Sequence, residues 1–254
     1  FGDYSLFQYI NRTSTPVGKQ HLADWFNAHL ELKESIEQRQ EAIRELSTDL
    51  EYRQQIRLFG LLYKGKPADT NEIREWEGSS SYYRKHTLLR IIPTVVSIIN
   101  LICIGSAIVG ILPATVPGGV FFCFVIFSSI FSKGITKLQA TYGEKLQILS
   151  TYADQILLTE KKEMNSPVLQ QLKTELTSQN QTASQAVRQL SKLMNALDQR
   201  SNLLMSTILN GLIFWELRQV MRIEKWKETH ASDLPRWIET IGEIDAYCSL
   251  ATFT

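Results

Sequence analysis

The stretch IIPTVVSIINLICIGSAIVGILPATVPGGVFFCFVIFSSIFS occupies residues Ile91–Ser132 and contains no charged side chain. A core helix of a soluble protein rarely continues for more than a few turns without charge. An uncharged run of 42 residues is instead typical of a chain that crosses a membrane twice. The stretch therefore predicts a hydrophobic helical hairpin in the middle of the chain.

The predicted hairpin has two arms separated by a turn. As an α-helix, the first arm, Ile91–Leu112, would span roughly 33 Å, which is about the thickness of a bilayer core. The second arm, Val116–Ser132, is shorter and rich in phenylalanine, and it spans the core if Lys133 extends its amine to the interface. Two prolines and two glycines within Pro113–Gly119 predict the turn.

Basic side chains flank the hairpin at both ends. They are Arg84, Lys85 and Arg90 before it, and Lys133 and Lys137 after it. Because the turn is uncharged, the positive-inside tendency predicts that both chain ends face the cytoplasm. We therefore expect a protein of the inner (cytoplasmic) membrane, with the lipid bilayer as a partner. Two alternatives stay open: a helical pair buried in a soluble, cytoplasmic protein, and a hairpin inserted in one leaflet only.

The charge balance of the chain argues against a segment that grips nucleic acid. Its 254 residues include 27 basic and 26 acidic side chains, for a formal net charge of +1. Domains that bind the phosphates of DNA usually show a strong basic excess. One candidate contact patch remains, formed by Arg218, Arg222, Lys225 and Lys227, for which a solvated helix end is the competing interpretation.

The sequence predicts no cofactor or metal chemistry in this segment. The three cysteines have no metal-ligand spacing, and the four histidines are scattered. The segment Gly60–Lys66 matches the first seven positions of a P-loop, but Pro67 stands where a hydroxyl residue should hold Mg²⁺. We therefore expect no catalytic, cofactor-binding or metal-binding residue here.

Residues 1–86 are predicted to form short amphipathic helices. Thr15 and Pro16 are a helix-start pair, with a hydroxyl N-cap followed by proline at the first helical position. A second helix is predicted over Leu32–Gly60, where apolar residues recur at helical spacing, and a loop is predicted over residues 62–71.

Residues 134–254 show heptads, which are typical of long helices packed side by side. The apolar register from Leu169 to Leu204, interrupted at Gln179 and Arg200, predicts one lever helix from about Pro167 to beyond Trp215.

A last helix is predicted over Leu234–Phe253, with Asp233 as its N-cap. The predicted fold class is thus all-α. A helical core domain with long antiparallel lever helices, residues 1–86 and 134–254, contains the inserted two-helix hydrophobic hairpin, residues 87–133.

Both ends of the chain resemble a known family. The run NRTSTPVGKQHLADWF, residues 11–26, is similar to the opening of the core (lever) domain of the MutS family of DNA mismatch-repair ATPases. Residues 36–46, 166–169 and 243–253 also resemble parts of this core. The signature positions are Thr13, Thr15, Gly18, Leu22, Trp25 and Arg39. The chain differs from the family at Gln20, where arginine is usual, and in lacking a counterpart of the DNA-gripping clamp.

The resemblance implies a helical transmitter that couples an ATPase to whatever is held at its far end. It implies ATP and Mg²⁺ for an ATPase domain outside this segment, a homodimer, and contact with DNA. Since the chain begins at Phe1, we expect a piece of a longer protein. Our interpretation is the non-catalytic core/lever segment of a membrane-anchored MutS-like ATPase. The alternatives are the core of a soluble MutS-type protein that binds mismatched DNA, and a membrane scaffold that binds partner helices without DNA.

Overall fold

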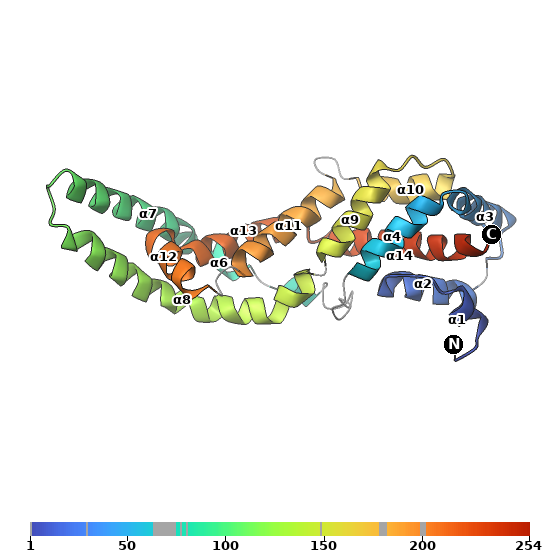
Figure 1. Cartoon of the computed structure of the whole chain (residues 1–254), viewed down its shortest axis with the longest axis horizontal. Helices are drawn as coiled ribbons and strands as arrows, with labels where there is room; N and C mark the ends of the chain where they lie inside the picture. The colour runs from blue at the N-terminus through green and yellow to red at the C-terminus, as the bar shows by residue number, and fades with distance from the viewer. Residues whose placement is uncertain are drawn as a thin grey trace. The chain divides into compact units, whose positions relative to one another are not determined.

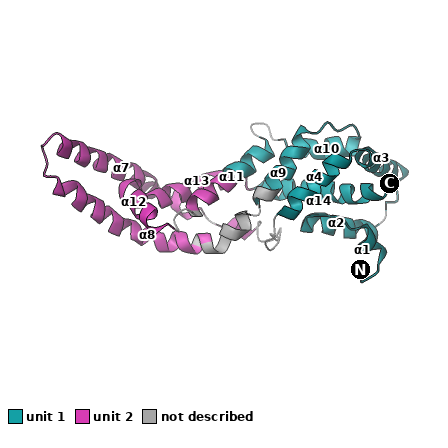
Figure 2. Cartoon of the chain, in the orientation of Figure 1, with its two compact units in different colours: residues 1–74, 148–189, 232–254 teal, residues 75–147, 190–231 magenta. Residues whose placement is uncertain are grey.

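The computed structural model describes residues 2–28, 30–62, 75–76, 78–79, 81–147, 149–177, 182–198 and 202–254; residues 138, 140–147, 150 and 151 are described by their backbone alone. These ranges are largely helical and contain no β-strand, which confirms the all-α prediction. Unit 1 comprises residues 1–74, 148–189 and 232–254, and unit 2 comprises residues 75–147 and 190–231 (Figure 2). The P-loop-like segment and the predicted loop fall mostly outside the described residues.

Unit 1 is a bundle of helices around the C-terminal helix α14 (Leu234–Leu250), as Figure 1 shows. Five helices pack against it: α2 (Pro16–Asn27), α3 (Lys33–Ser47), α4 (Leu50–Leu62), α9 (Leu149–Lys161) and α10 (Pro167–Glu175). The unit also contains α1 (Leu6–Ile10), the first part of α11 (Ala183–Asp198) and the 3₁₀ turn η2 (Ala251–Phe253). Most of α14 is buried, so this helix forms the centre of the core.

Two predicted helix starts are confirmed. Thr15 is the N-cap of α2, where its hydroxyl accepts a hydrogen bond from the backbone nitrogen of Gly18 at 3.0 Å, and Pro16 follows at the first helical position. Asp233 is the N-cap of α14, with Pro235 in the first turn.

The single helix predicted over Leu32–Gly60 is wrong, because the structure has two helices there, α3 and α4. At the end of α3 the hydroxyls of Ser47 and Thr48 donate to carbonyls three residues earlier. Asp49 then starts α4, since its Oδ1 accepts a hydrogen bond from the backbone nitrogen of Tyr52 at 2.9 Å. Such short polar side chains compete with the helical backbone for hydrogen bonds and favour helix ends.

The prediction of one long lever helix from Pro167 to beyond Trp215 is also wrong. The described residues of this stretch form four helices: α10, α11, α12 (Leu203–Ile213) and α13 (Trp215–His230). Between the last two, Phe214 adopts a left-handed backbone conformation (φ 54°, ψ 51°), which ends α12.

The apolar heptad positions are mostly buried up to the end of α11 and become exposed after it. Leucines of the predicted register are buried at Leu169, Leu172, Leu176, Leu190 and Leu197. The register fails at Leu204, which is 79% exposed. The interruptions expected at Gln179 and Arg200 lie outside the residues that the structure describes.

Unit 2 contains the hydrophobic hairpin. Helices α7 (Thr87–Ile108) and α8 (Thr115–Gln147) pack against each other and meet at a turn (Figure 1). The short helix α6 (Tyr82–Lys85) precedes α7, and both α12 and α13 pack against α7 and α8. The second part of α11 belongs to this unit as well.

The turn of the hairpin is shorter than the predicted Pro113–Gly119. Helix α8 already begins at Thr115, so Pro117 lies in its first turn. A proline is tolerated there because the first backbone N–H groups of a helix have no intrahelical acceptor. The turn instead comprises residues 109–114, and it includes Gly110, whose φ of +80° glycine adopts without strain.

Both hairpin helices contain a segment long and apolar enough to cross a membrane. The segments are Thr87–Ile108, with a mean hydropathy of 2.2, and Thr115–Lys137, with 1.8. Within the most apolar 18 residues of each segment, the protein itself buries 17% in the first and 0% in the second. Helix α12 is a third apolar helix of the unit but is too short to cross.

Candidate functional site

The hairpin exposes large apolar side chains along both of its helices. On α7 they include Leu88, Ile91, Ile98, Leu101, Ile102 and Ile108, and on α8 they include Phe122, Ile126, Phe127 and Ile130. Soluble proteins rarely expose apolar surface of this extent, and where it occurs it marks contact with lipid or with another protein.

Exposed basic residues lie at matching heights on the two hairpin helices. Arg90 precedes the end of α7 at Ile108 by 18 residues, and Lys133 follows the start of α8 at Thr115 by 18 residues. At the helical rise, each lies about 27 Å from the turn. That distance is close to the thickness of a bilayer core, so the two cations can both reach headgroups on one side of a membrane.

The remaining predicted flank residues divide into two groups. Lys85 and Lys137 are exposed. Arg84 is instead bonded to α13, where its Nε donates to Oε2 of Glu228 at 2.5 Å and its backbone nitrogen donates to Oε2 of Glu224 at 2.6 Å. Burial raises the pKa of Glu224, and the bonds from the α6 backbone oppose that rise. Arg84 thus fixes α6 to α13.

A buried amide joins α7 to α12. Asn100 is 4% exposed, and its Nδ2 donates to the carbonyl oxygens of Gly211 and Leu212 at 3.0 Å each. Gly211 also permits α12 to approach α8, because a Cβ there would lie 2.3 Å from the ring of Phe121. This junction was not predicted from the sequence. Two features could have indicated it: the lone amide side chain within residues 91–132 and the uncharged run over residues 203–215.

Two charged residues near the start of α13 bond to neighbouring polar groups of unit 2. Glu216, which is 5% exposed, accepts hydrogen bonds from the hydroxyls of Ser132 at 3.1 Å and Ser206 at 2.9 Å. Arg218 donates to the carbonyl of Pro93 at 2.8 Å and to the hydroxyl of Ser97 at 2.9 Å. Both charges are thus engaged within the protein.

The four basic residues of the candidate contact patch do not share one surface. By helical spacing, residues 218, 222 and 225 lie on one face of α13, whereas residue 227 lies on the opposite face. Lys227 is 9% exposed, donates to the hydroxyl of Ser79 at 2.7 Å and lies over the ring of Trp76. Arg222 and Lys225 are exposed and stay candidates for contact with phosphate groups.

Two signature residues, Thr15 and Gly18, join the start of α2 to α14. The carboxylate of Asp245 accepts hydrogen bonds from the backbone nitrogens of Ser14 and Thr15 and from the Thr15 hydroxyl, each at 2.8 Å. A Cβ at Gly18 would lie 2.5 Å from Oδ2 of Asp245, so this close approach requires glycine. Sequence reasoning missed Asp245, whose signal is a single carboxylate on the apolar face of the last helix.

The other signature residues lie around the same joint. Leu22 is fully buried, and the rings of Trp25 and Tyr247 lie 4.7 Å apart. The guanidinium of Arg39 lies 4.3 Å from the centre of the Trp25 ring, a cation–π contact. Thr13 donates its hydroxyl hydrogen to Oδ1 of Asn11 at 2.6 Å. The Trp25–Tyr247 contact thus joins α2 to α14, and the Arg39–Trp25 contact joins α3 to α2.

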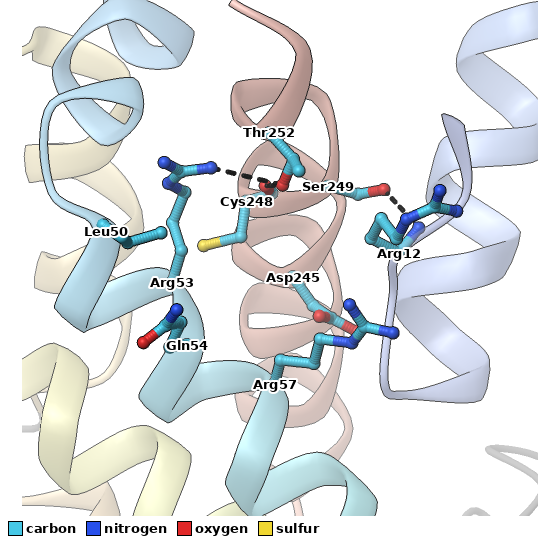
Figure 3. Close-up of a pocket in the computed structure, with 9 residues that line it drawn as sticks. All are labelled: Arg12, Leu50, Arg53, Gln54, Arg57, Asp245, Cys248, Ser249 and Thr252. Carbon is cyan, nitrogen blue, oxygen red and sulfur yellow. Dashed lines mark hydrogen bonds between the residues drawn. The ribbon is translucent and has the colours of Figure 1, made fainter. Parts of the chain in front are cut away.

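A small cavity lies beside this joint, between α4 and α14 (Figure 3). Its volume is about 160 Å³, and its lining includes Arg12, Arg53, Arg57, Asp245 and Cys248. Arg53 donates to the hydroxyl of Thr252 at 3.2 Å, and the backbone nitrogen of Arg12 donates to the hydroxyl of Ser249 at 2.8 Å. The guanidinium groups of these three arginines could bind an anion that carries a carboxylate or phosphate group.

Two titratable groups that line this cavity have pKa values raised by burial. Burial raises the pKa of the Cys248 thiol well above its ordinary value, which keeps it protonated and poorly nucleophilic. Burial also raises the pKa of Asp245 to about 6, although hydrogen bonds from Thr15 and Ser14 lower it. Across the described part of the chain, no group of three His, Cys, Asp or Glu side chains could hold a metal ion.

Comparison with known proteins gives one match. A family model described as MutS domain III matches residues 2–251. Searches of curated proteins and of solved structures found no match.

Proposed function

The chain belongs to the MutS domain III family and is the core of a MutS-like protein, and we propose that it is the non-catalytic core of a membrane-anchored MutS-like ATPase. In this proposal unit 2 anchors the protein in the inner membrane, with both chain ends in the cytoplasm. Unit 1 transmits conformational change between the anchored end and an ATPase domain outside residues 1–254. ATP and Mg²⁺ bind that domain. The protein acts as a homodimer, a part of the proposal that rests on family membership alone.

The observation that carries the anchor is the exposed apolar hairpin. Helices α7 and α8 present their apolar side chains outward, although a pair buried in a soluble core would have them covered. Arg90 and Lys133 bound this surface at equal distances from the turn, as cations at a membrane interface do. The uncharged turn around Gly110 supports passage of this end through the bilayer.

The observation that supports transmission is the joint at Asp245. A buried carboxylate that accepts bonds from two backbone nitrogens and two hydroxyls connects the two ends of unit 1. Such a polar network is rigid when all its members are satisfied, because any displacement leaves a buried group unpaired. A displacement applied to α14 is therefore carried to α2 as a unit.

The competing function is a soluble core that binds mismatched DNA. Family membership favours it, and exposed Arg222 and Lys225 offer two phosphate contacts. The net charge of +1 argues against it, since affinity for DNA rises with the number of phosphates neutralised.

Two measurements on the purified full-length protein separate these functions. The first is co-flotation with liposomes that contain anionic lipid, and the second is fluorescence anisotropy with a mismatched DNA duplex at several salt concentrations. We expect flotation that persists in high salt, because the anchor is apolar, and weak DNA binding that disappears in salt. Tight mismatch binding without flotation would establish the competing function.

A further inference from the structure

The cavity between α4 and α14 has arginines on two sides (Figure 3). Arg53 and Arg57 are four residues apart, so they project from the same face of α4. Arg12 approaches from the segment between α1 and α2, on the other side in the view of Figure 3. The wall that α14 and η2 contribute consists of Asp245, Cys248, Ser249 and Thr252. All of these residues belong to unit 1.

Two of the arginines are held in place by neutral groups. Arg53 donates to the hydroxyl of Thr252 at 3.2 Å and to the carbonyl of Ser47 at 3.1 Å. Arg12 donates from its guanidinium to the carbonyl of Asn11 at 3.1 Å. These bonds fix the side chains beside the cavity without neutralising their charge, which is the arrangement of a preorganised anion site.

Two of the arginines also have donors that the protein does not use. Within the described part of the chain, Arg57 makes no hydrogen bond and no ion pair. The Nε of Arg53 is buried and has no acceptor among the described residues. A buried donor without an acceptor is unfavourable, so native structures rarely leave one. The unused donors therefore point to an acceptor that comes from outside the chain.

Asp245 is the only acidic residue among the described residues that line the cavity, and it does not neutralise the arginines. Its Oδ2 accepts hydrogen bonds from the backbone nitrogens of Ser14 and Thr15 and from the Thr15 hydroxyl. Burial raises its pKa to about 6, so it is ionised at pH 8. Three arginines and one carboxylate then leave the cavity with an excess of two positive charges.

The size and the charge of the cavity favour a phosphate group as its ligand. Its volume is about 160 Å³. Sites for whole small molecules usually measure about 300–1,000 Å³, so this cavity suits one small group. A phosphate monoester carries a charge of about −1.5 to −2 near neutral pH, which balances the excess better than a single carboxylate does. Guanidinium groups also bind phosphate oxygens through pairs of hydrogen bonds.

We propose that this cavity binds a phosphate group, which belongs either to inorganic phosphate or to a phosphate monoester. Arg12, Arg53 and Arg57 supply the donors, and the bound phosphate ties α4 to the segment before α2. The inference goes beyond the proposed function. It does not depend on the membrane anchor, because the cavity lies in unit 1 and the hairpin lies in unit 2.

Isothermal titration calorimetry of the full-length protein, purified in detergent at pH 8 without nucleotide, tests this binding. The titrants are inorganic phosphate, glycerol 3-phosphate and, as a carboxylate, acetate. Arg57→Gln removes one donor group, and it should leave the fold intact because the Arg57 side chain bonds to no described residue. Arg57→Lys keeps the charge but loses the planar fork. Arg44→Gln is the matched control, at an exposed arginine of α3 that does not line the cavity.

The natural protein and the Arg44→Gln variant should bind inorganic phosphate equally. Arg57→Gln should weaken this binding roughly ten- to a hundredfold, as expected when a hydrogen bond to a charged group is lost. Arg57→Lys should fall between them. Any phosphate site outside residues 1–254 is common to all four proteins, so only the differences between them report on the cavity. Glycerol 3-phosphate should show the same order if the ligand is a monoester, and no binding if it is inorganic phosphate.

Three results would overturn the inference. The first is equal binding of phosphate by the natural protein and Arg57→Gln, or no binding by either. The second is an equal loss in Arg57→Gln and Arg44→Gln, which indicates a general effect of surface charge. The third is binding of acetate as tight as that of phosphate, which excludes a site selective for phosphate. None of these results affects the proposed membrane anchor.

Discussion

The hydroxyl oxygen of Thr15 lies 2.8 Å from Oδ2 of Asp245, across 230 residues of sequence. The same hydroxyl accepts a hydrogen bond from the backbone nitrogen of Gly18 and so caps α2. One side chain thus starts a helix and ties it to the central helix of unit 1. This double role explains why a threonine, and not any helix starter, stands at this signature position.

Removing the hydroxyl should therefore destabilise unit 1 more than the loss of a cap alone. Thr15→Ala removes the N-cap and leaves a buried carboxylate one donor short, at a combined cost of about 2–4 kcal/mol in the free energy of unfolding. Thr15→Ser keeps the hydroxyl and is the matched control, which should lose less than half as much. Urea unfolding of both variants gives the comparison, and equal stabilities of the alanine and serine variants would contradict the double role.

The stability contributed by Asp245 should depend on pH. Its pKa rises from 3.8 in the unfolded chain to about 6 in the folded protein, so the folded state binds the proton more tightly. Its contribution is therefore fully present below pH 3.8 and is lost as the pH rises through about 6. The total change is about 3 kcal/mol.

The Asp245→Asn variant isolates this effect because asparagine does not titrate. The difference in unfolding free energy between the natural protein and the variant is measured from pH 4 to pH 7.5, with other titrating groups common to both. We expect the natural protein to lose stability relative to the variant as the pH rises. A flat difference would show that the folded pKa of Asp245 is close to its ordinary value.

Gly18 should tolerate no side chain. In Gly18→Ala the new Cβ would lie 2.5 Å from Oδ2 of Asp245 and 2.8 Å from the Thr15 hydroxyl, so α2 must move away from α14. A loss of about 1–3 kcal/mol is expected from such overpacking. Gly105→Ala is the control, because no atom lies within 4 Å of its added Cβ. Thermal unfolding should show a large shift for the first variant and none, or a small gain, for the second.

The Asn100 amide should be needed to hold α12 on the hairpin. Asn100→Leu leaves two buried carbonyls without donors and should cost about 2–4 kcal/mol. Limited proteolysis of the variant should then cut within α12 sooner than in the natural protein. Asn100→Gln, which keeps an amide, should restore part of the protection. Unchanged proteolysis of the leucine variant would mean that packing of Gly211 against Phe121 suffices.

The hairpin was predictable because its signal is local. A charge-free run of this length has few structural solutions, and α7 and α8 cover the two predicted arms apart from the last residues of the first, although α8 continues beyond the run to Gln147. The start of α2 at Thr15 and Pro16 was predictable for the same reason, since a cap is a property of neighbouring residues.

The breaks in the long helices were not predicted, because heptad spacing contains no information about where a helix ends. Asp49 and Phe214 end or start helices through a single side-chain bond or a single backbone conformation, which leave the apolar period almost unchanged. The joints at Asp245 and Asn100 were missed because their partners lie more than 100 residues away in sequence.

The central claim, a membrane anchor formed by the hairpin, is tested most directly by alkaline-carbonate extraction of membranes from cells that express the full-length protein. The natural protein is compared with three variants. The first lacks residues 91–132, and the second carries Ile102→Asp and Ile126→Asp in the hairpin. The third is a matched control with Leu58→Asp and Leu61→Asp, at exposed leucines of α4. The account predicts that the natural protein and the α4 variant stay in the pellet, while the deletion and the hairpin variant are released. A natural protein that is itself released by carbonate would contradict the account and leave the soluble DNA-binding core as the better function.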